Sequence, residues 1–155
     1  MSRRLRNMAA QREALRRSVE DFGDKGLSEP NWETVFSSPD PDDVNLTMQV
    51  VGCYEHLVGN LAELARGGAR MTGLADGRRP RAEECFTALE QDGVFTSRQR
   101  ATLDQLYVFC GRLGHASPNV AADEVALHVK IALRQVPTLT KALVAWLAER
   151  GIEIA

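Results

Sequence analysis

Residues 40–65 read DPDDVNLTMQVVGCYEHLVGNLAELA and predict one long amphipathic helix. Asp40 suits the N-cap and Pro41 the first helical position, and the two aspartates that follow favour the positive end of the helix dipole. Apolar side chains then recur at three- and four-residue steps, as in a buried stripe. The predicted stripe consists of Val44, Met48, Val51, Tyr54, Val58, Leu61 and Ala65. The segment from Gly73 to Pro80 is expected to end the helix.

Helical periodicity continues on both sides of this segment, whereas strand signals are almost absent. The helices that we expect cover residues 3–22, 80–91, 97–115 and 121–150, and a polar, acidic connection covers residues 24–40. Within that connection, the side chains expected to dock on the core are Trp32, Val35 and Phe36. The prediction is an all-α fold, an antiparallel bundle of four main helices plus an N-terminal helix.

Local signals mark the ends of these helices. Thr96 with Gln99 fits a capping box at the start of the fourth helix, and Gly93 stops the third. Pro137 lies inside the last helix and should kink it, and Gly151 suits the position just after its end. We expect residues 1–26 to form an arginine-rich N-terminal helix and residues 27–155 to form the bundle domain.

Composition narrows the class of protein. The chain has 155 residues, of which 44% are hydrophobic and 26% charged, as in one globular domain. It has neither an apolar run long enough to cross a membrane nor the apolar core of a secretory signal, so a cytoplasmic protein is expected. Cys53, Cys85 and Cys110 are scattered, which argues against a disulfide framework. No metal-ligand spacing or phosphate-binding glycine loop is present, and no cofactor is expected.

The net charge of −2 conceals strong segregation along the chain. Residues 1–20 carry a balance of +4, residues 21–43 a balance of −6, and residues 66–81 again +4. The arginines of the last segment are Arg66, Arg70, Arg78, Arg79 and Arg81. A basic patch of this kind is what contact with nucleic-acid phosphates requires. The alternative is a solvated helix face followed by a flexible loop.

The segment 106–120 begins with apolar residues and ends with the candidate catalytic and binding residues. Arg112 and His115 are three residues apart, so on a continuing helix they share a face and can reach one ligand. Ser117 and Asn119 follow in a proline turn and add small polar groups. The alternative is an exposed helix end where both cations complement the dipole. His128 is expected to be a surface or helix-contact residue.

From about Trp32 onward, the chain resembles the HepT-like branch of the HEPN proteins, small all-α bacterial proteins often found as toxins with nucleotidyltransferase antitoxins. Several segments, in this order, carry the resemblance: Cys85–Val94, Ala101–Leu106, Gly111–His115 and the long last helix. The resemblance implies a metal-independent ribonuclease that acts as a homodimer. His115 would be the acid and base for attack by a ribose 2′-OH, and Arg112 would stabilise the developing charge.

The chain departs from the family's catalytic pattern. The family's arginine would stand at Val108, Phe109 or Cys110, and Gly111 replaces the polar residue after it. Ser117 stands where many HepT-like toxins carry the tyrosine to which the partner antitoxin attaches AMP.

Two functions of different class therefore stay open. One is a toxin-type ribonuclease of weak activity, in which Arg112 has replaced the missing arginine, and Arg66, Arg70, Arg78 and Arg79 guide RNA. The other is a non-catalytic HEPN-fold protein that binds nucleotide, RNA or an antitoxin-like partner; an unrelated helical bundle is a third reading. The expected partners are RNA, a nucleotidyltransferase-type antitoxin and a second copy of this chain. Val108 and Phe109 lie partly outside the predicted core stripe, so a second subunit is expected to cover them unless a broad bundle interior buries them.

Overall fold

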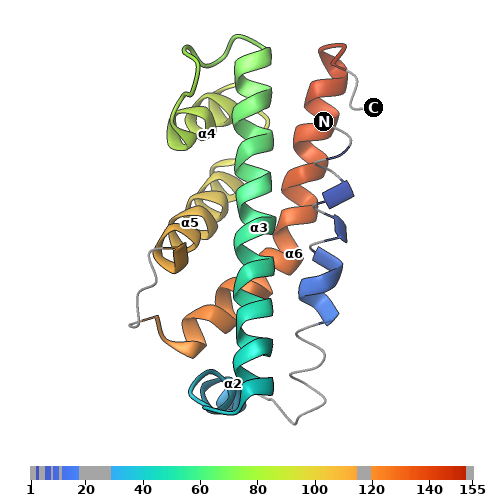
Figure 1. Cartoon of the computed structure of the whole chain (residues 1–155). Helices are drawn as coiled ribbons and strands as arrows, with labels where there is room; N and C mark the ends of the chain where they lie inside the picture. The colour runs from blue at the N-terminus through green and yellow to red at the C-terminus, as the bar shows by residue number, and fades with distance from the viewer. Residues whose placement is uncertain are drawn as a thin grey trace.

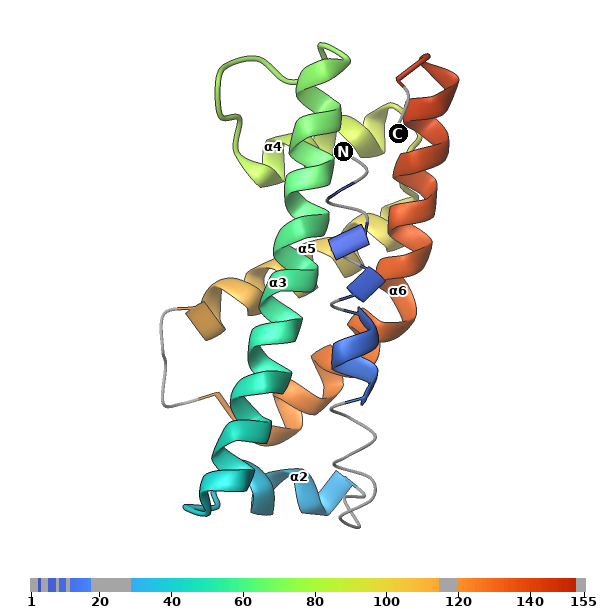
Figure 2. The same cartoon turned by 45° about the vertical axis from the view of Figure 1, so that its right-hand side comes forward.

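The computed structural model describes residues 3, 6–7, 9–10, 12–17, 29–114 and 120–152. These residues contain no strand, and the predicted all-α bundle is confirmed. The helices with described bounds are α2 (Glu29–Phe36), α3 (Pro41–Met71), α4 (Ala82–Gln91), α5 (Ser97–Gly114) and α6 (Ala122–Glu149). Of the predicted N-terminal helix, residues 12–17 are helical and lie alongside α6 (Figures 1 and 2).

Helix α3 is the centre of the bundle and packs against α2, α4, α5 and α6. Figure 1 shows α4 and α5 on one side of α3, α6 on the other, and α2 across its N-terminal end. Helix α5 runs back obliquely against α3, whereas α6 rises in the same direction as α3. The bundle is therefore antiparallel between α3 and α5 but parallel between α3 and α6.

The predicted helix boundaries are confirmed where local chemistry sets them. The Asp40 side chain accepts a hydrogen bond of 2.8 Å from the amide of Asp42, which satisfies one free donor of the first turn of α3. In the capping box, Gln99 accepts from the Thr96 amide at 2.9 Å and donates its own amide to the Thr96 hydroxyl at 3.1 Å. Gly151 has a φ of 69° after α6, a left-handed conformation that favours glycine.

Pro137 lies inside α6 as predicted, and the helix changes direction between its orange and red parts (Figures 1 and 2). Proline has no amide hydrogen, so the carbonyl of Leu133, four residues earlier, loses its intrahelical donor. The Arg12 Nε donates to that carbonyl at 3.3 Å. The N-terminal segment therefore supplies a donor where the proline has removed one.

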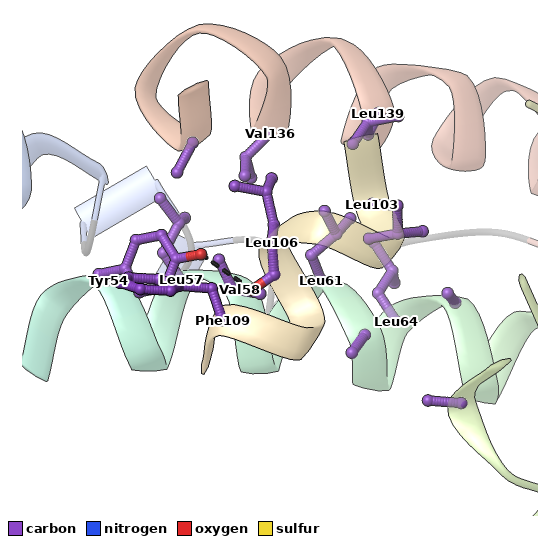
Figure 3. Packing of buried hydrophobic residues seen from close by; sticks show 14 of the residues in the cluster. Tyr54, Leu57, Val58, Leu61, Leu64, Leu103, Leu106, Phe109, Val136 and Leu139 are labelled. Carbon is purple, nitrogen blue, oxygen red and sulfur yellow. Dashed lines mark hydrogen bonds between the residues drawn. The ribbon is translucent and has the colours of Figure 1, made fainter. Parts of the chain in front are cut away.

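Helices α3, α5 and α6 contribute most of the hydrophobic core shown in Figure 3. The rings of Tyr54 and Phe109 meet edge to face, with centroids 5.7 Å apart. The Tyr54 hydroxyl donates to the carbonyl of Leu106 at 2.8 Å, so this buried polar group is satisfied. Leu15 of the N-terminal segment is also fully buried in the same cluster.

Two expectations about packing were wrong. Residues 29–36 form α2 and not an irregular connection, although Trp32 and Val35 are buried as expected. The first three turns of α3 bury Leu46 and Val50, while Met48 of the predicted stripe is 67% exposed and Val44 is exposed too. Apolar residues occur on both faces of these turns, and the contact with α2 and α6 selects the face that is buried.

Phe109 also differs from expectation. Its side chain is only 1% exposed and belongs to the core, so no second subunit is needed to cover it. Val108, the next residue back on α5, is 60% exposed, and Tyr107 and Cys110 are half-buried. Of the four apolar residues 107–110, Val108 alone keeps the exposure that the dimer prediction requires.

The end of α6 is joined to the end of α4 through Asp92. Its carboxylate accepts from the indole Nε1 of Trp146 at 2.7 Å and pairs with Arg150, whose guanidinium lies 4.4 Å from the centre of the Trp146 ring. Substitution Asp92→Ala should lower the free energy of unfolding by about 1–3 kcal/mol, because both donors lose a charged acceptor. Asp92→Asn keeps an acceptor for the indole and should lose less. Urea denaturation tests this, and equal midpoints for all three proteins would contradict it.

Candidate functional site

Arg112 occupies the last turn of α5, and its side chain is 49% exposed. One guanidinium nitrogen lies 2.8 Å from Glu124 Oε2 on the first turn of α6, and the guanidinium carbon lies 5.6 Å from the centre of the Phe109 ring. A carboxylate so close neutralises much of the field that an anionic ligand would meet. Arg112 is accessible, but here it serves as half of an ion pair between α5 and α6.

His115, the other predicted catalytic residue, and Ser117 and Asn119, predicted to bind RNA or a partner, lie outside the described residues. Their proximity to Arg112 therefore stays a prediction. Cys110 stands at one of the positions where the family pattern has its arginine, and its Sγ donates a weak hydrogen bond of 3.7 Å to the carbonyl of Glu55. Burial, reinforced by the Glu55 charge, raises the pKa of Cys110 to about 11. The thiol is therefore protonated and uncharged at neutral pH. It cannot take the role of the arginine in the family pattern.

His128 forms a contact between α5 and α6. This is one of the two positions, at the surface or between helices, that the sequence predicted for it. Its side chain is 8% exposed and its ring stacks on Phe109, with centroids 3.8 Å apart and planes 11° apart. Nδ1 lies 2.6 Å from the carbonyl of Glu124, so this nitrogen carries the hydrogen and donates it. Nε2 faces the Gln105 amide nitrogen at 3.5 Å. These contacts hold α6 against α5 near Arg112.

The four arginines predicted to bind a backbone lie together. Arg66, Arg70, Arg78 and Arg79 line one groove of about 500 Å³ between the end of α3 and the loop before α4, which we call the arginine groove. Its remaining lining residues are Glu63, Gly67 and Pro80. Four guanidinium groups against one carboxylate give the groove a positive balance.

Side-chain contacts to the backbone hold the loop of the arginine groove in place. Arg66 Nε donates to the carbonyl of Pro80 at 3.1 Å, and Arg70 donates to the carbonyl of Arg78 at 3.4 Å. Arg66 also pairs with Glu63 at 2.8 Å. Two arginines of α3 therefore position the loop, and Arg78 and Arg79 of this loop line the same groove. The groove is largely preorganised.

A second hollow of about 510 Å³ adjoins the arginine groove and shares Glu63 and Gly67 with it. Arg3 and Asn7 of the N-terminal segment line it together with Asn60 and Met71 of α3. The sequence indicated that the N-terminal arginines form a separate basic segment, but it carried no signal that Arg3 lies beside the end of α3.

The structure does not bring Arg112 to the arginine groove. The groove is built from α3 and the loop before α4, whereas Arg112 lies at the end of α5 that points away from α4 (Figure 1). Within the described part of the chain, no three His, Cys, Asp or Glu side chains are grouped as metal ligands would be. No described helix is both long and apolar enough to span a membrane.

Comparisons with known proteins find a similar fold among solved structures. No known family profile matches the sequence, and no curated protein matches it. Among solved structures, a chain from the "Crystal structure of the toxin-antitoxin with AMP-PNP" superposes with a TM-score of 0.61. The match covers 88% of this chain and 97% of that chain, with 14% sequence identity. At this identity the similarity shows the fold: this chain folds like a chain from a toxin–antitoxin complex.

Proposed function

We propose that this chain is a toxin-like protein of the HepT-like HEPN type and that it binds RNA along the arginine groove. The observation that carries the proposal is the convergence of Arg66, Arg70, Arg78 and Arg79 on one groove whose loop is held by hydrogen bonds. Arginine matches phosphate with a planar fork of donors, so a row of such groups suits a polyanionic backbone. The fold shared with a toxin–antitoxin chain supports the toxin-like class.

Glu63 provides the test of this proposal. Among the described residues it is the one carboxylate that lines the arginine groove, and its side chain is half exposed. Glu63→Gln should tighten the binding of single-stranded RNA by about 2- to 5-fold at low salt, because it removes a like charge from the phosphate path. Fluorescence anisotropy with a labelled oligonucleotide measures the effect. The matched control is Glu149→Gln, an exposed glutamate at the end of α6, which should change affinity little. Absence of RNA binding by the unsubstituted protein would refute the proposal.

A ribonuclease is the second candidate, favoured by the exposure of Arg112 three residues before His115. In this proposal His115 takes the proton from a ribose 2′-OH, whose oxygen attacks the adjacent phosphorus. The bond from phosphorus to the 5′-oxygen breaks, His115 returns the proton to that oxygen, and Arg112 stabilises the phosphorane charge. The ion pair with Glu124 must then open, so Glu124→Gln should raise cleavage by a few-fold while Arg112→Ala and His115→Ala abolish it. Cleavage of a labelled RNA with added chelator measures all three. Cleavage that survives both alanine substitutions would contradict this site.

The partner proposals follow from the same resemblance. A homodimer is expected to use the α5 surface around Val108, and a nucleotidyltransferase-type antitoxin is the expected protein partner. The exposed residues of this α5 surface are Val108, Gly111 and Arg112. Sedimentation at tens of micromolar, about the range where ordinary dimers persist, tests the dimer. A monomer there would contradict it.

A further inference from the structure

A third hollow of about 480 Å³ lies between α4 and α5, beside the arginine groove. The two share Arg66, whose guanidinium group therefore borders both. The lining residues of this hollow, which we call the Tyr107 pocket, are Arg66, Arg81, Ala82, Glu83, Glu84 and Tyr107. It contains an aromatic ring, whereas no described residue that lines the arginine groove is aromatic.

Tyr107 is well placed to offer its ring to a ligand. The side chain is half-buried, and its ring meets Phe86 edge to face with centroids 5.5 Å apart and planes at 89°. This contact fixes the orientation of the ring, so little conformational entropy would be lost when a ligand binds. Burial raises the pKa of Tyr107, so the phenol is neutral at physiological pH and does not repel phosphate.

Two arginines, Arg66 and Arg81, and two carboxylates, Glu83 and Glu84, line the Tyr107 pocket. Arg66 donates to the Pro80 carbonyl and pairs with Glu63, so its own charge is partly neutralised. The positive balance of the adjoining arginine groove is supplied by Arg70, Arg78 and Arg79. Glu83 and Glu84, in the first turn of α4, line the same pocket. These two carboxylates disfavour a phosphate beside them, but they accept hydrogen bonds from the N–H groups of a nucleobase. A nucleotide would therefore place its phosphate on Arg66 and its base towards Tyr107 and α4.

We infer that the Tyr107 pocket takes one base of a single-stranded RNA whose backbone continues from Arg66 along the arginine groove. The inference rests on the proposed RNA-binding function and adds a site for one unpaired base. Stacking on an aromatic ring requires a base that is free of its helix, whereas a duplex presents only backbone and base edges. Arginines beside a partly exposed aromatic ring, as Tyr107 is, are a combination that single-stranded nucleic acids bind.

The test compares Tyr107→Leu with Tyr107→Phe, which keeps the ring. We expect Tyr107→Leu to weaken the binding of a single-stranded RNA of about 12 nucleotides by roughly tenfold, and Tyr107→Phe to leave it unchanged within about twofold. Inorganic polyphosphate, which has charge but no base, should bind both variants equally. Arg79→Ala, in the arginine groove, should weaken both ligands.

The outcomes separate the inference from the proposed function. If Arg79→Ala weakens RNA binding and Tyr107→Leu does not, the base pocket is wrong and the RNA-binding groove stands. If neither substitution has an effect, or the unsubstituted protein binds no RNA, both fail. Equal losses of RNA and polyphosphate in Tyr107→Leu would also overturn the pocket, because stacking cannot act on a ligand without bases.

Tyr107→Leu also removes the ring contact with Phe86, which could affect folding. A second measurement uses the unsubstituted protein and avoids this effect. Ultraviolet cross-linking of the unsubstituted protein to single-stranded RNA, followed by trypsin digestion, should attach nucleotide to the peptide Ala101–Arg112, which contains Tyr107. Cross-links confined to other peptides would refute the inference.

Discussion

Phe109→Ala should lower the free energy of unfolding by about 3–5 kcal/mol, the range found when a fully buried phenylalanine is truncated. Phe109 is 1% exposed, meets Tyr54 edge to face and stacks on His128 at 3.8 Å. Its loss leaves a cavity between α3, α5 and α6 and removes both ring contacts. Urea denaturation followed by far-ultraviolet circular dichroism measures the change.

Val108→Ala is the matched control, one residue away on the same helix. Its side chain is 60% exposed, so the substitution should change the unfolding free energy of one subunit by no more than about 0.5 kcal/mol. The comparison is made at a protein concentration where the chain is monomeric. If Val108→Ala then lowers the free energy of unfolding as much as Phe109→Ala does, the assignment of Phe109 to the core and Val108 to the surface is wrong.

Arg78→Glu combined with Arg79→Glu should weaken the binding of single-stranded RNA by at least roughly 100-fold at low salt. Both side chains are exposed, and both line the arginine groove, so the substitution replaces two phosphate contacts with repulsion. The plot of log affinity against log salt concentration should become shallower by roughly 1 to 2, because fewer counterions are released. Anisotropy titrations at several salt concentrations measure both effects.

The control carries the same change in net charge at other places. Arg98 at the start of α5 and Arg134 on α6 are exposed and line none of the three hollows. Arg98→Glu combined with Arg134→Glu should weaken binding by only a few-fold, through the long-range field of the protein. If both double variants lose affinity equally, RNA binding depends on total charge and not on the arginine groove.

Helix ends were predictable because the groups that set them are neighbours in the sequence. The Asp40 cap, the Thr96–Gln99 capping box and the glycine after α6 each require residues within a few positions of one another. The sequence also predicted which arginines would form the arginine groove, because all four lie between residues 66 and 79. Short-range chemistry alone explains these successes.

Which apolar face is buried was harder to predict, because both faces of a helix can carry apolar side chains. Val44 and Met48 fit the predicted periodicity as well as Leu46 and Val50 do, yet only the latter two are buried. Helix α2 was missed because eight residues give only two turns, too few for periodicity to stand out from an acidic connection.

The sequence was sufficient for the helical class, the helix ends and the clustering of charge, since each depends on spacing along one segment. The packing of the helices was needed for everything that joins distant residues. It places Phe109 between Tyr54 and His128, pairs Arg112 with Glu124 across twelve residues, and sets Tyr107 beside Arg66. These contacts depend on the angle at which α5 crosses α3 and on the bend of α6. Both arise from the burial of apolar surface over the whole bundle, which has no signature in any single segment.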